Sequence, residues 1–207
     1  MSRLGFWKGA GYEAGYFGVR LLVLGEAAYA RDGVPAPTAR LLVECHLDPR
    51  AVRSSERHWL RTYTRFVWIM SEAAAPGTTC DRKEVWQRLA FQNYLLKPGG
   101  SRPRQTLPED DPAWREARPA FETVLAELKP EAVVVWGQHL WGCLERCAGL
   151  IFSSDKQGID GEIRVAPVAI VPAFRLRHPS SCPKVQEWGQ RTRTFLTAAQ
   201  MPRPFNP

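Results

Sequence analysis

A short apolar run that ends in glycine and is followed at once by a carboxylate constrains this chain more than any other stretch. Residues 21–24 read Leu-Leu-Val-Leu, and Gly25 and Glu26 follow them. Branched apolar residues over so short a length predict a buried strand. Glycine lets the backbone turn sharply and approach a ligand closely. We therefore expect Glu26 just past the carboxyl end of a strand, where open α/β sheets bind ligands. A solvated loop carboxylate is the alternative.

Helix and strand patterns alternate along the rest of the chain. Apolar residues at helical spacing predict helices near 38–47, 59–70, 81–89, 112–128, after 137, and 184–199. Apolar runs predict further strands at the end of 89–96, at 131–137 and at 163–174, the last broken by two prolines. This alternation predicts one domain over residues 1–207, a three-layer α/β/α sandwich with a central, mainly parallel four-stranded sheet. The glycine- and aromatic-rich residues 1–18 form either a flap over a site or, more in keeping with a chain terminus, a packed arm.

Three polar residues stand at the ends of predicted strands. Glu26 follows the first strand, Asn93 ends the second, and His178 follows the fourth apolar run. The carboxyl ends of parallel strands share one edge, so these side chains could converge. Asn93 lies in an apolar patch, and a buried amide needs hydrogen-bond partners from the backbone or from a ligand.

Positive charge favours a polyanionic partner. The chain has 207 residues, 44% of them hydrophobic, which is ample for a core, and its net charge is +7. An excess of this size favours nucleic acid, with simple solubility as the alternative. Arginines recur at helical spacing at 57, 61 and 65, and a basic loop spans 97–104. Either could lie along a phosphate backbone or in solvent.

The cysteine pattern favours a reduced, cytoplasmic protein. Five cysteines are scattered without a CxxC pair, the first residues lack a signal-peptide core, and no apolar run is long enough to span a bilayer. We therefore expect no membrane partner. Cys143 and Cys147 lie one helical turn apart and could bind a metal if other ligands converged. Small core residues are the favoured reading of this pair, so no metal is predicted.

These motifs resemble those of the uracil-DNA glycosylase superfamily. Residues 25–29, Gly-Glu-Ala-Ala-Tyr, resemble the family's strand-end Gly-Glu-Ala-Pro-Gly and Gly-Gln-Asp-Pro-Tyr forms. Residues 178–180 resemble its His-Pro-Ser motif, Asn93 matches its base-reading asparagine, and residues 128–137 are similar to the Lys-Pro, apolar strand and glycine between them. The order agrees from about Arg20 to Phe195. Ala28 replaces a proline, the apolar wedge after His-Pro-Ser is not obvious, and the cysteine spacing of the iron–sulfur branches is missing, so no cluster or other cofactor is expected.

The resemblance implies a DNA glycosylase that flips a base out and hydrolyses its N-glycosidic bond, leaving an abasic site. It implies that Glu26 orients water and stabilises the cationic sugar, with Asp32 as second choice for the water. His178 would donate a hydrogen bond to the leaving base, and Asn93 would read the base edge. An inward Tyr29 would exclude 5-substituted pyrimidines, whereas an outward one would admit a bulkier base. The other implied contacts are Gly25, Ala27 and Tyr29 to the base, and Arg102, Arg104, Arg175, Arg177, Ser180 and Ser181 to DNA.

Several functions remain open at this point. The substrate is uracil or a modified pyrimidine in single- or double-stranded DNA, and a monomer is expected. One alternative is a phage-defence glycosylase that excises a hypermodified cytosine, such as glucosylated hydroxymethylcytosine. A second is a non-catalytic DNA-binding module on the same fold. A nucleotide-processing α/β enzyme is less favoured, because the chain lacks a glycine-rich phosphate loop.

Overall fold

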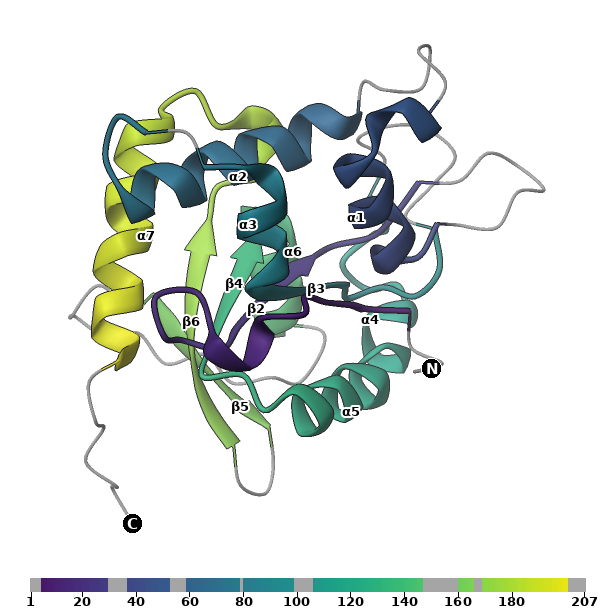
Figure 1. Ribbon diagram of the computed structural model, residues 1–207. Helices are drawn as coiled ribbons and strands as arrows, with labels where there is room; N and C mark the ends of the chain where they lie inside the picture. Colours follow the sequence, from purple (N-terminus) through teal and green to yellow (C-terminus); the bar gives the residue numbers. More distant parts are fainter. Residues whose placement is uncertain are drawn as a thin grey trace.

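The protein is an α/β fold in which helices flank a mixed sheet (Figure 1). The computed structural model describes residues 5–29, 37–52, 59–78, 80–98, 106–146, 160–165 and 169–200, and the statements below concern these residues. Within them, no helix has both the length and the apolar character needed to cross a membrane.

The sheet has six strands in the order β1-β3-β2-β4-β6-β5. Its four central strands run parallel, and the edge strands β1 and β5 are antiparallel to their neighbours. The expectation of a four-stranded sheet is therefore corrected to a six-stranded mixed one. The strands are β1 (Trp7–Lys8), β2 (Leu21–Gly25), β3 (Leu89–Asn93), β4 (Ala132–Trp136), β5 (Gly161–Val165) and β6 (Ala169–Leu176).

The two edge strands were not predicted from the sequence, for physical reasons. β1 has two residues, too few to display a period. The apolar run at 163–174, predicted as one broken strand, is a hairpin of β5 and β6. Pro172 lies inside β6 opposite Glu162, and the pairing of β6 with β4 begins only at Ala173. Pro172 therefore lies outside the paired stretch of β6 and β4, and its missing N–H interrupts no pairing between these two strands.

The helices agree with the predicted segments except at 112–128, where two helices replace one. Pro119 stands in the first turn of the second of these, where its missing N–H is tolerated. Two helices begin at a side-chain N-cap: Thr38 accepts from Leu41 N at 3.2 Å, and Asp81 accepts from Lys83 N at 2.8 Å. The helices are α1 (Ala39–Leu47), α2 (Leu60–Ala74), α3 (Arg82–Gln87), α4 (Ala113–Glu116), α5 (Arg118–Leu128), α6 (Gln138–Arg146) and α7 (Val185–Gln200).

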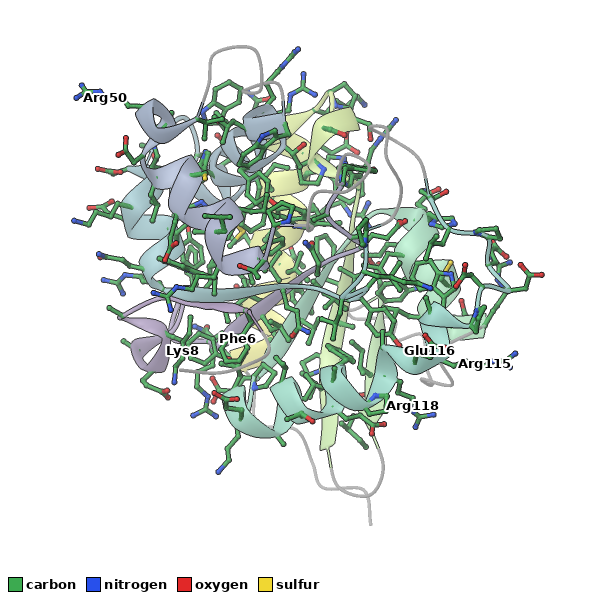
Figure 2. The ribbon with its side chains drawn as sticks, turned by 90° about the vertical axis from the view of Figure 1, so that its right-hand side faces the viewer. Phe6, Lys8, Arg50, Arg115, Glu116 and Arg118 are labelled. Carbon is green, nitrogen blue, oxygen red and sulfur yellow. The ribbon has the colours of Figure 1, made fainter. Side chains whose placement is uncertain are left out.

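Two hydrophobic clusters cover the two faces of the sheet. Alternate residues of β2 point to opposite faces, so Leu21 and Val23 join one cluster, with α1, α2, α3 and α7, while Leu22 and Leu24 join the other, with α4, α5 and α6. The N-terminal residues pack as an arm: Phe6 and Tyr12 are buried, and Trp7 pairs with Phe91. Figure 2 places Phe6 and Lys8 on this arm, and Arg115, Glu116 and Arg118 on α4 and α5.

Candidate functional site

The carboxyl ends of the four parallel strands bring the predicted residues to one edge of the sheet. Gly25, the last residue of β2, pairs with Asn93, the last residue of β3. Glu26 follows β2, and His178 lies two residues past β6. β3 and β6 are separated by three strand spacings in the sheet order, about 14 Å. A ligand that touched both Asn93 and His178 would therefore pass over Glu26 and the end of β4.

Gly25 leaves room for the Asn93 amide. A Cβ at Gly25 would lie only 2.6 Å from Asn93 Oδ1 and 3.2 Å from the Phe91 ring. Tyr94 N donates to Gly25 O at 2.8 Å, which fixes the backbone here. Asn93 is only 9% exposed, and its side chain has no hydrogen-bond partner among the described residues. As far as the described residues go, the amide is held in place and its donor and acceptor can bind a ligand.

A pocket of about 180 Å³ opens beside this amide. Its wall includes Asn93 and Gln92 at the end of β3, Ala28 after β2, Thr38 at the start of α1, and Lys97. Gln92 is 1% exposed, and neither its Oε1 nor its Nε2 has a partner in the described structure. Sequence reasoning missed Gln92, although it is a polar residue in the same apolar run as Asn93. Unpaired buried amides are uncommon, and here they adjoin a pocket.

Glu26 is held by a histidine that sequence reasoning also missed. Its Oε2 lies 3.0 Å from His139 Nδ1, and His139 Nε2 lies 3.7 Å from Cys143 Sγ. A carboxylate can only accept, so Nδ1 carries a proton; in the Nδ1–H tautomer of an imidazole, Nε2 presents a lone pair. The sequence offered one signal for His139: it stands two residues after Gly137, the glycine that follows β4, whereas Glu26 directly follows the glycine that ends β2. Glu109, His139 and Cys143 together are the metal-ligand group found in the described residues.

His178 is fixed in one tautomer by the turn that follows it. Its Nδ1 accepts from Ser180 N at 3.3 Å and lies 2.7 Å from Ser180 Oγ, in the 3₁₀ turn η4 (Pro179–Ser181). Burial lowers the pKa of His178 to about 4, so the ring is neutral at pH 7. Since Nδ1 accepts the backbone bond, Nε2 carries the proton and can donate it to a hydrogen bond. Gly137, at φ +95°, lies against this ring: a Cβ there would be 3.4 Å from His178 Cβ.

The cations and N–H groups near η4 are partly engaged already. Ser180 N donates to the His178 ring and Ser181 N to His178 O, so a phosphate bound by these groups would have to replace both bonds. Arg65 of α2 donates to Ser180 O at 2.5 Å, which brings a guanidinium beside the turn. Arg175 is exposed and stands 5.8 Å from the Trp141 ring centroid, and Arg177 is exposed as well.

The remaining predicted residues have varied placements. Tyr29 is 41% exposed and does not line the pocket beside Asn93. Ala27 is half-buried against the cluster on the α4–α6 face. The aromatic ring of Phe66, on α2, is fully buried against Trp86 and Trp136, so it is a core residue and cannot stack on a base. The predicted residues that lie outside the described ranges are Asp32, Arg57, Arg102, Arg104 and Cys147.

Comparison with known proteins does not assign this chain to a family. No protein-family model matches the chain, and no curated protein matches it significantly. The resemblance to uracil-DNA glycosylases therefore depends on the strand-end motifs alone. Function has to be argued from the side chains at the carboxyl edge, because a fold of this class hosts many activities.

Proposed function

We propose that this chain is a monomeric DNA glycosylase that hydrolyses the N-glycosidic bond of a flipped pyrimidine. The observation that carries the proposal is the arrangement at the carboxyl edge of the sheet. There a buried amide with no partner in the described part of the chain (Asn93), an oriented carboxylate (Glu26) and a neutral histidine with its proton on Nε2 (His178) stand at the ends of parallel strands. These are an acceptor and donor for a base edge, a negative charge for a cationic sugar, and a donor for a leaving base.

Each group suits one part of the reaction. As the bond between C1′ and the base breaks, positive charge develops on the sugar and negative charge on the base. Glu26 would act on the sugar: it would stabilise the positive charge there, orient water toward C1′ and accept a proton from that water. His178 would act on the departing base: its Nε2–H would donate a hydrogen bond to the negative charge that develops there, and the ring can donate at pH 7 without being charged. His139 keeps the Glu26 carboxylate in one orientation.

The pocket favours a small base. Its volume of about 180 Å³ is below the roughly 300–1,000 Å³ typical of pockets for larger ligands. A single pyrimidine ring suits it better than a glucosylated cytosine does, so uracil is the first substrate to test. Tyr29 does not line this pocket and would not itself exclude a 5-substituted pyrimidine from it. The charge of +7, together with Arg65, Arg175 and Arg177 near the His178 turn, supports DNA as the partner.

Abasic-site formation tests the proposal directly. The protein is incubated with single- and double-stranded oligonucleotides containing uracil, and with DNA containing glucosylated hydroxymethylcytosine, followed by alkaline cleavage. We expect breaks at uracil, and a loss of about 10²–10⁴-fold in rate for Glu26→Gln, because this change removes the charge but keeps the shape. Glu122→Gln is the matched control: this carboxylate lies on α5 and pairs with Arg118 at 2.8 Å.

The outcomes separate the competing functions. Breaks only in the modified DNA would favour the alternative function, a phage-defence glycosylase that excises a hypermodified cytosine. Salt-sensitive DNA binding without any base release, retained in Glu26→Gln and His178→Ala, would refute catalysis and favour a binding module. Turnover of free nucleotides with no effect on DNA would point to nucleotide metabolism.

A further inference from the structure

Three side chains with the chemistry of zinc ligands meet at α6. One ligand atom each of Glu109, His139 and Cys143 lies within 4.8 Å of the other two. His139 and Cys143 are four residues apart on α6 and so share one face of the helix, while Glu109 comes from the turn before α4. We propose that these three residues bind a zinc ion. This site goes beyond the proposed glycosylase activity and does not depend on it.

The spacing of the nitrogen and sulfur atoms matches tetrahedral zinc. Zn–S and Zn–N bonds of about 2.3 Å and 2.0 Å at a tetrahedral angle separate the two ligand atoms by about 3.5 Å. His139 Nε2 and Cys143 Sγ are 3.7 Å apart. An ion can therefore fit with little movement of α6.

Glu109 also contacts Arg146, with Oε1 at 2.5 Å from Nη2. A carboxylate has two oxygens with several lone pairs, so an ion pair with arginine and coordination of a metal are compatible. Three protein ligands leave a fourth position for water, the arrangement of zinc sites that remain open to substrate. Cys143 is fully buried, and a zinc ion would neutralise its thiolate there.

Glu26 completes the arrangement from the other side of the imidazole. Histidines that bind metals through one nitrogen usually donate the other N–H to a carboxylate or carbonyl, which fixes the ring and strengthens the ligand. His139 has this pattern: Nδ1 faces Glu26 Oε2 at 3.0 Å, and Nε2 faces Cys143. The Trp114 ring packs edge-on at 5.8 Å and limits rotation of the imidazole.

Metal titration of the untagged, reduced, chelator-treated protein tests the site. We expect one equivalent of Zn²⁺ to bind in competition with a chromophoric chelator, and Co²⁺ to give a thiolate-to-cobalt charge-transfer band in the near ultraviolet. Cys143→Ser should abolish that band. Glu109→Gln should weaken Zn²⁺ binding by at least about tenfold, and Glu26→Gln, which acts through His139, by about 10–100-fold.

Cys45→Ser is the matched control, because Cys45 lies on α1 at the opposite face of the sheet. It should leave the cobalt band and the stoichiometry unchanged. The proposal is overturned if the unaltered protein shows no cobalt–thiolate band, or if Cys143→Ser keeps it. Should Cys143→Ser not fold, Glu109→Gln decides, since Glu109 is exposed and its change threatens no core contact. Base release measured with and without chelator reports on the glycosylase separately.

Discussion

Replacing Gly25 by alanine tests whether the end of β2 is shaped around the Asn93 amide. The new Cβ would stand 2.6 Å from Asn93 Oδ1. Ordinary van der Waals contact begins at 3.4 Å, so the two atoms would be roughly 0.8 Å too close. The backbone cannot retreat without breaking the pairing of β2 with β3. Overpacking of this kind costs about 1–3 kcal/mol in the free energy of unfolding. For a chain of this size that lowers Tm by about 2–4 °C per kcal/mol.

The Asn93 amide has to move away from the Cβ, so base recognition should suffer more than stability does. A misplacement of about 1 Å can cost on the order of 10²-fold in rate. We therefore expect Gly25→Ala to remain folded at 25 °C and to lose about that factor in kcat/KM for uracil release. Gly142→Ala is the control, because a Cβ there meets only the end of the Arg146 side chain. Unchanged Tm and kcat/KM in Gly25→Ala would refute this account of the strand end.

Three further predictions concern titration and backbone strain. Burial lowers the pKa of His46 to about 4, and its Nδ1 accepts a hydrogen bond from Trp86 Nε1. The free energy of unfolding should therefore fall by up to about 3 kcal/mol as the pH drops from 6.5 to 4. Denaturant unfolding of His46→Gln should show a weaker dependence of stability on pH over this range. Lys129→Gly should raise stability by about 0.5–1 kcal/mol in the same assay, because Lys129 has φ +46°. His178 should show the Nε2–H tautomer at pH 7 and titrate near pH 4 by nitrogen NMR; an Nδ1–H tautomer would contradict its bond from Ser180.

The ends of the central strands were predictable from the sequence. A buried strand needs an unbroken apolar run, so the residue at which the run stops marks the end of the strand. Gly25, Glu26 and Asn93 could be placed in this way. The edge strand β5 could not, because a proline in β6 resembles a break until the partners of each N–H are known. His139 was missed for another reason: it lies in the first turn of a helix, and only the packing of α6 against the sheet brings its ring to Glu26.

The two proposals meet at His139 but can fail separately. With Nδ1–H donating to Glu26, the Nδ1–H tautomer of His139 has its lone pair on Nε2, toward Cys143. Orientation of the carboxylate and coordination of zinc thus require the same tautomer, and neither excludes the other. Glu26→Gln removes the negative charge on the sugar side yet leaves Nε2 in place, whereas Cys143→Ser removes a metal ligand and leaves Glu26 bonded to His139. If base release depends on Cys143 as well as on Glu26, the metal contributes to catalysis; if only Glu26 matters, zinc has a structural role beside the site.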